Sequence, residues 1–229
     1  MNNFSPSRLL CLLPLFLLSA CIGDDFVDDR VDPELRLTAR VDTIGFGESF
    51  QFTTAYLNNI GQQEDVPVQW SSSDETVIAV DQTGLATGLQ TGAADLTAEV
   101  MPAGEPAVSV THRVAVGDET VTGPAGRTGS IATTSSYLLQ GAFEIEASGS
   151  DLVIDFADNF SADTRLPGLY VYLTNNPNTT NGALEIGPVT IFSGAHQITV
   201  PDVDLATYSY ILYFCKPFNV KVGDGEIQE

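Results

Sequence analysis

The chain has 229 residues, with 9 Lys and Arg against 30 Asp and Glu, and its formal net charge is −21. An acidic excess of this size repels nucleic acid and anionic lipid headgroups, which excludes nucleic acid as a partner. The length is sufficient for one large domain or two modest ones.

The first residues have the features of an export signal. A Leu-rich stretch follows Arg8 and ends in Leu18-Ser19-Ala20-Cys21. It is shorter than the roughly 20 residues needed to span a bilayer, so we predict a cleaved signal peptide over residues 1–20. The four residues resemble the lipobox of bacterial lipoproteins, which implies that Cys21 carries three acyl chains. Two chains already give stable anchoring. An ordinary secretory signal cut nearby is the alternative.

Residues 21–33 are predicted to form an acidic tether, because Asp24, Asp25, Asp28 and Asp29 repel one another and extend the segment. The segment resembles the tether that sends lipoproteins of the Bacteroidota to the outer face of the outer membrane. A plain solvated linker is the alternative interpretation. We therefore expect a lipid anchor in the outer membrane, on its periplasmic or its cell-surface side.

From Glu34 onward the sequence predicts an all-β protein. Short runs such as Phe50-Gln51-Phe52 and Phe143-Glu144-Ile145 alternate in polarity, and turn residues separate them. This spacing is typical of sandwiches or barrels. Gly, Pro and acidic residues cluster between Gly117 and Gly126, so two β-sandwich-like domains in series are predicted, over residues 34–117 and 124–229.

The first domain has one specific stretch, Trp70-Ser71-Ser72-Ser73-Asp74, followed by Val77-Ile78-Ala79-Val80-Asp81 and by Gly84. We expect Trp70 in the core, a capped turn after it, and a tight turn at Gly84. The pattern resembles the bacterial immunoglobulin-like group 2 domain, with Ile78 as a departure. That resemblance implies a small sandwich used as a spacer or adhesion module, without catalytic residues. His112 is expected to be solvated.

The second domain contains Leu169-Tyr170-Val171-Tyr172-Leu173, then Val200-Pro201, and finally Phe214-Cys215-Lys216-Pro217-Phe218. These runs resemble the DM-thirteen domain, a family associated with electron transfer, and the resemblance implies that Cys215 is a redox residue. Gly168 and Tyr137 depart from the family, which has Asp and often His at these positions.

Cys215 is the only free thiol once Cys11 leaves with the signal and Cys21 is acylated, so no internal disulfide is possible. Its strand is apolar on both faces, which predicts a central, buried position. Burial raises the pKa of a thiol, whereas a neighbouring Lys216 lowers it. Cys215 is therefore either a reactive thiolate or a buried small hydrophobe. A redox role requires a partner thiol, a one-electron step or a bound metal.

No cofactor and no metal site are predicted. His112, His196 and Met101 show no ligand spacing. Asp155, Asp158 and Asp163 have irregular spacing, which favours a solvated acidic loop over a weak calcium site.

These observations predict a lipid-anchored envelope protein without enzymatic activity. The first domain holds the second away from the membrane for binding or scaffolding, with exposed Tyr170 and Tyr172 as contact candidates. Its partners are the membrane, through Cys21, and an unidentified envelope protein or redox partner. Electron transfer or thiol exchange at Cys215 is the alternative function.

Overall fold

The computed structural model of the chain describes residues 29–121 and 126–228. Apart from one short 3-10 helix, η1 (Lys216–Phe218), all regular elements in these ranges are β-strands, which confirms the all-β prediction. Within the same ranges, no helix has the length and apolarity needed to cross a bilayer. The predicted signal peptide, Cys21 and the first part of the tether lie outside the described residues.

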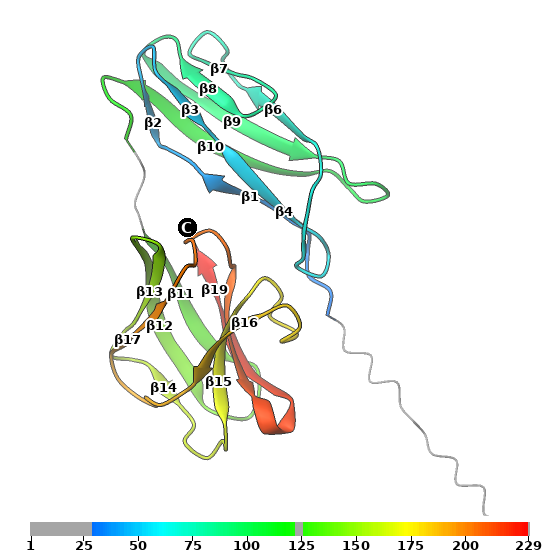
Figure 1. Cartoon of the computed structure of the whole chain (residues 1–229), viewed down its shortest axis with the longest axis vertical. Coiled ribbons are helices and arrows are strands. Elements are labelled where there is room, and N and C mark those ends of the chain that lie inside the picture. Colours follow the sequence, from blue (N-terminus) through cyan, green and yellow to red (C-terminus); the bar gives the residue numbers. More distant parts are fainter. Residues whose placement is uncertain (1–28, 122–125, 229) are drawn as a thin grey trace, which may run out of the picture.

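The N-terminal unit, residues 34–117, contains ten strands in small sheets (Figure 1). They are β1 (Glu34–Ala39), β2 (Thr43–Gly45), β3 (Ser49–Gln51), β4 (Thr53–Leu57), β5 (Gln63–Glu64), β6 (Val68–Ser72), β7 (Ile78–Val80), β8 (Leu85–Gly88), β9 (Gly92–Val100) and β10 (Val108–Gly117). The sheets have the orders β1-β4-β5, β2-β10-β9-β6 and β3-β8-β7. All pairs are antiparallel except β2 with β10.

Trp70 lies in the core of this unit and is 7% exposed, as predicted. The turn after it is capped: the Asp74 carboxylate accepts from the backbone N–H and the hydroxyl of Thr76, at 3.0 and 2.6 Å. Gly84 has φ +86°, and a Cβ there would lie 2.9 Å from the Trp70 ring. Only glycine meets both demands, because the backbone is left-handed and the ring is already in contact.

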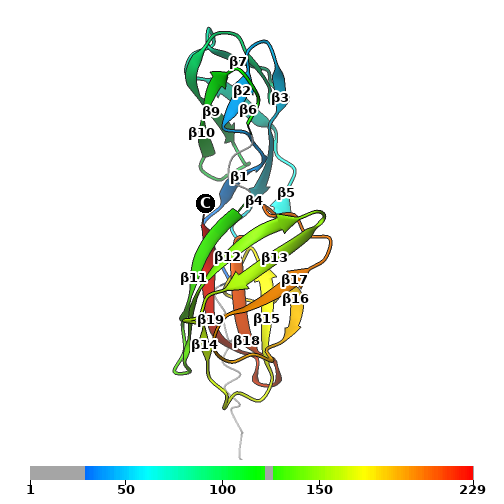
Figure 2. The same cartoon turned by 90° about the vertical axis from the view of Figure 1, so that its left-hand side faces the viewer.

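The C-terminal unit, residues 126–228, is built from one nine-stranded antiparallel sheet that curls around its core (Figure 2). Its strands are β11 (Gly126–Thr133), β12 (Leu139–Ser148), β13 (Asp151–Phe156), β14 (Ser161–Ala162), β15 (Leu169–Thr174), β16 (Leu184–Pro188), β17 (His196–Val200), β18 (Tyr210–Cys215) and β19 (Val220–Gln228). The order is β16-β15-β18-β19-β11-β12-β13-β17, with β14 on β12. The sandwich-like layering therefore comes from a single sheet rolled toward a barrel.

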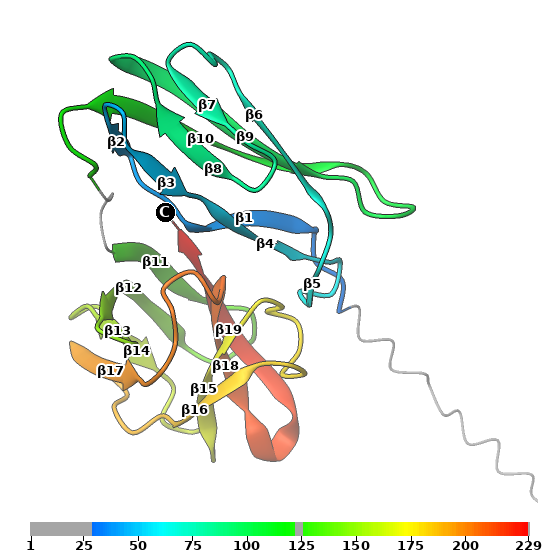
Figure 3. The same ribbon diagram turned by 45° about the horizontal axis from the view of Figure 1, so that its top comes forward.

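The two units have separate hydrophobic cores and meet end to side at a junction. The edge formed by β1 and β4 faces the end of the C-terminal unit where β11 begins and β19 ends (Figure 3). Two open cavities of about 550 and about 500 Å³ lie at this junction, so the units are not fused into one packed core. Specific polar contacts must therefore hold the junction.

Candidate functional site

Cys215 is part of the apolar core of the C-terminal unit. Its strand, β18, lies between β15 and β19, and the side chain is 1% exposed among residues such as Ile211 and Tyr213. This confirms the predicted central, buried strand. A nucleophilic thiol needs access for its reaction partner. The described structure gives Cys215 the environment of a small core hydrophobe instead.

Lys216 directs its ammonium group away from that core. The Nζ atom bonds both carboxylate oxygens of Glu185, at 2.9 and 2.7 Å, and lies 4.7 Å from the Tyr170 ring centre. The hydrogen bond from Lys216 lowers the pKa of Glu185 and in turn raises that of Lys216. The lysine charge is thus paired on the opposite face of the sheet from Cys215. The two predicted members of a thiolate site are not brought together.

The two tyrosines predicted as exposed contacts differ in position. Tyr170 is half-buried beneath Lys216, but Tyr172 is only 5% exposed, so the expectation that it is exposed is wrong. Tyr172 packs with Leu212 and Phe214 in a small second cluster, and its hydroxyl donates to Glu185 at 3.2 Å. Burial, followed by the nearby Glu185 charge, raises the pKa of Tyr172. The prediction that residues of β15 alternate between two faces is correct, but both faces of this strand are covered.

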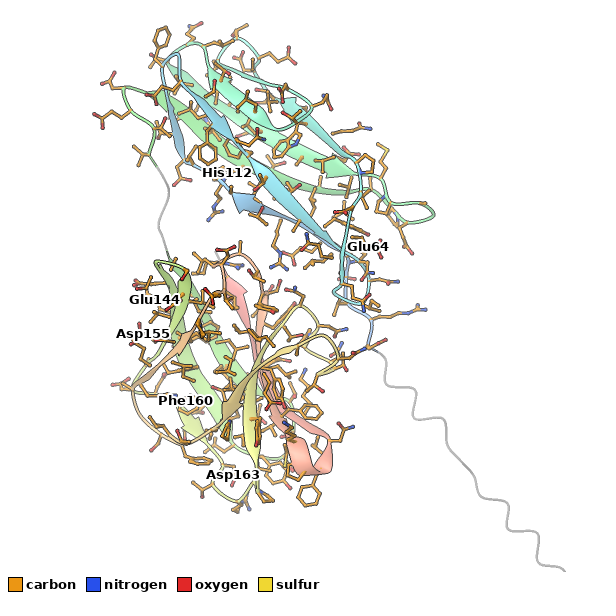
Figure 4. The ribbon with its side chains drawn as sticks, viewed as in Figure 1. Glu64, His112, Glu144, Asp155, Phe160 and Asp163 are labelled. Carbon is orange, nitrogen blue, oxygen red and sulfur yellow. The ribbon has the colours of Figure 1, made fainter. Side chains whose placement is uncertain are left out.

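Two further polar residues depart from their expected solvation. The imidazole of His112 is 16% exposed, and its Nε2 lies 3.1 Å from the Val41 carbonyl and 3.2 Å from Asp42 (Figure 4). Asp163 is buried and accepts 2.9 Å bonds from the backbone N–H and the Nε of Arg165. These bonds lower the pKa of Asp163 to about 2. Neither residue is a solvated side chain, because each has a fixed partner.

No group of three or more His, Cys, Asp or Glu side chains suitable for a metal ion occurs among the described residues. Asp155 accepts a 2.8 Å bond from Gln197, whereas Asp163 is paired with Arg165. The carboxylates of Asp155 and Asp163 in this acidic stretch are thus paired with other side chains of the protein.

The most organised polar cluster lies at the junction between the units and is centred on Arg36 of β1. The guanidinium is 8% exposed and donates to Ala206 O at 2.9 Å, Asn175 Oδ1 at 3.0 Å and Ser209 Oγ at 2.6 Å. All three acceptors belong to the C-terminal unit. Ser209 donates in turn to Glu34 at 3.1 Å, and Glu34 lies 3.3 Å from Arg36. We call these five residues the Arg36 clamp.

Burial lowers the pKa of Arg36, while Glu34 opposes that change. An arginine remains protonated under such conditions, so a full charge is held at the junction. Removing one partner of a buried charge is strongly destabilising, because the remaining group has lost its contact with water. The Arg36 clamp therefore fixes how the two units are oriented.

A glycine permits the close approach of the units beside the clamp. Gly61 has φ +75°, and a Cβ there would lie 2.6 Å from the Asn175 carbonyl oxygen. Asn176 continues the contact by donating to Ile60 O at 3.1 Å. Any larger residue at position 61 would strain the turn and push the units apart.

The described part of the tether also lies at this junction. Asn176 and Asn178 of the C-terminal unit donate to the carbonyls of Asp29 and Arg30, the second at 3.2 Å. On the other side, Val31 N–H donates to Asn59 O at 2.9 Å. The tether thus contacts both units where they meet, and does not leave from the far end of the N-terminal unit (Figures 1 and 3).

The Arg36 clamp leaves no recognisable pattern in the sequence. The alternation Leu35-Arg36-Leu37 correctly indicates that Arg36 points away from the core of its own unit, since Leu35 and Leu37 pack into that core. Such a position usually faces solvent. Only the second unit, which covers this face, makes Arg36 a buried residue.

Comparison with known proteins gives a family match and similarities to solved structures, of which two are described here. No curated protein matches the chain. The S-layer protein rSbsC(31-844) is 16% identical, with 85% of this chain and 27% of that chain covered and a TM-score of 0.29. Domains 4 and 5 of S-layer protein SbsC are 14% identical, with 85% and 96% covered and the same TM-score. Similarities this weak assign no role.

The family match concerns the N-terminal unit. It spans residues 36–112 and corresponds to the bacterial Ig-like domain (group 2). The stretch from Trp70 to Gly84, on which the predicted resemblance rests, lies within it. The chain therefore carries a bacterial Ig-like domain of group 2 in its N-terminal unit.

Proposed function

We propose that this protein is a lipid-anchored scaffold of the bacterial cell envelope, held by Cys21 and presenting its C-terminal unit to a partner in that compartment. The observation that carries this proposal is the junction. Here the Arg36 clamp fixes the Ig-like domain to the C-terminal unit, and the described part of the tether lies at the same place. A buried contact in which both terminal nitrogens of Arg36 are hydrogen-bonded across two domains suits a rigid bracket.

The position of the tether changes the expected arrangement on the membrane. Seven residues lie between Cys21 and Asp29, and the eight residue steps that join them reach at most about 29 Å when extended. Because the tether contacts both units, both lie beside the attachment point. We therefore propose that the protein is anchored near the junction between its two units. The Ig-like domain is then not a spacer that holds the C-terminal unit away from the membrane.

Fatty-acid labelling tests the anchor. Cells expressing the full chain are grown with an alkyne fatty acid, and the protein is then isolated from membrane and soluble fractions. We expect label and membrane attachment in the wild type and in Cys215→Ser, and loss of both in Cys21→Ser. Soluble, unlabelled wild-type protein would refute the lipid anchor. In cells that lack the protein, the Cys215→Ser chain is expected to restore cell-envelope function as the wild-type chain does.

The DM-thirteen resemblance of the C-terminal unit, with redox chemistry at Cys215, is the alternative proposal. The buried thiol and the paired Lys216 do not favour it. Alkylation of the folded Cys11→Ser/Cys21→Ser chain, in which Cys215 is the remaining thiol, tests it directly. We expect Cys215 to react about 100-fold more slowly than in the unfolded chain, because reaction requires local opening. Labelling of the folded chain at the unfolded rate would restore the redox proposal.

A further inference from the structure

A small cavity in the C-terminal unit has a polar pair at its wall that the scaffold function does not use. It lies where β15 and β18 meet the segment that joins β16 to β17, and its volume is about 80 Å³. Most of the wall is apolar, with Val171, Val189 and Ile198 among its residues. Tyr213 and His196 also line the cavity.

Tyr213 brings a buried hydroxyl to this cavity. The side chain is 1% exposed, and its ring lies 6.2 Å from that of Phe160, which Figure 4 labels inside the unit. Burial raises the pKa of Tyr213, so the hydroxyl stays neutral and remains a donor. It makes no hydrogen bond with any residue in the described ranges. The hydroxyl is therefore available to pair with a molecule that enters the cavity.

His196 provides a complementary acceptor. Its Nδ1 lies 3.0 Å from the Gly194 carbonyl, and a carbonyl oxygen only accepts, so the proton is on Nδ1. In the tautomer with its proton on Nδ1, the Nε2 atom is an acceptor. The ring is stacked on Phe156 with centroids 4.6 Å apart, and the edge of Phe160 contacts it at 4.7 Å. These two contacts hold the imidazole in one orientation.

We propose that this cavity binds a small organic molecule with a hydroxyl group. A hydroxyl accepts from Tyr213 while it donates to His196, and an attached alkyl or aryl group fills the apolar remainder. The volume exceeds the 10 to 15 Å³ that one water needs by several fold, so a guest of several non-hydrogen atoms fits. Apolar walls with a few convergent polar groups are the usual design of such sites.

Titration with 1-propanol and with phenol, followed by NMR, tests the proposal on the full Cys21→Ser chain. We expect saturable shifts of the methyl groups of Val171 and Ile198 and of the His196 ring. Tyr213→Phe should weaken binding about tenfold, the value of one net hydrogen bond. Tyr137→Phe changes a tyrosine on the same core but outside the cavity, and it should bind like the wild type.

If Tyr213→Phe does not fold, the variant His196→Phe provides a second test of binding in the cavity. His196→Phe retains an aromatic ring for the stack on Phe156 but removes the acceptor, so it should also bind about tenfold more weakly. Shifts that grow linearly without saturation would overturn the proposal. So would equal affinity in the wild type and the variants, or water alone in contact with the Tyr213 hydroxyl at saturating alcohol.

Discussion

The two units reach the same secondary structure in different ways. The Ig-like domain uses three small sheets and short-range turns: Asp74 and Asp81 each bind the backbone N–H and the hydroxyl of a Thr two residues later. In the C-terminal unit, one sheet joins distant segments, such as β19 with β11. Local turns leave a recognisable sequence pattern, whereas long-range pairing depends on the whole chain. The family match lies in the unit with the local turns, over residues 36–112.

The largest expected effects come from core truncation in one unit at a time. Ile78 of the Ig-like domain and Ile145 of the C-terminal unit are both 0% exposed. Each Ile→Ala change should cost about 3 kcal/mol. Trp70 is the only tryptophan, so its fluorescence during urea unfolding reports on the Ig-like domain. We expect Ile78→Ala to shift that transition and Ile145→Ala to leave it nearly unchanged. Equal shifts in both variants would show that the units unfold together.

Arg36→Met tests the contact between the units. It removes the donors to Ala206, Asn175 and Ser209, and we expect a loss of about 2 kcal/mol of unfolding free energy. Small-angle X-ray scattering should also show a broader range of dimensions. Arg113→Met is the matched control, because its ion pair with Asp95 is exposed and contributes less than about 0.5 kcal/mol. An unchanged scattering curve for Arg36→Met would mean that the clamp does not set the orientation.

Acid should weaken the C-terminal unit through Asp163. Its pKa is about 2 in the folded unit and near 3.8 in an unfolded chain, because Arg165 binds the charged form. The unfolded state therefore takes up the proton first, and the stability from this pair is lost as pH falls from about 4 to about 2. Asp163→Asn should reduce that pH dependence in thermal unfolding, and an unchanged pH dependence in this variant would contradict the prediction.

The smallest effect is expected for Lys216→Met. The Lys216–Glu185 pair is solvent-exposed, so its loss should change the unfolding free energy by about 0.5 kcal/mol or less. The rate of Cys215 alkylation should stay the same, because the ammonium is paired on the other face of the sheet. A marked fall in that rate would show that Lys216 does activate the thiol.

The sequence predicted the elements better than their surroundings. Alternation and turn residues were sufficient for the all-β class, for Trp70 in the core and for Cys215 in a central strand. The same patterns failed for Tyr172 and His112, which were expected in solvent. Alternation identifies which residues share a face, but it does not reveal whether a second layer covers that face.

By itself, then, the sequence of this protein determined where strands and turns form and which residues face the core of their own unit, because these depend on neighbours along the chain. Only the tertiary structure decided that Arg36 is buried between two units, that the described part of the tether contacts their junction, and that Tyr213 and His196 share a cavity. Each of these features brings together residues that lie far apart in the sequence. The burial of such residues depends on surfaces that local sequence patterns do not encode.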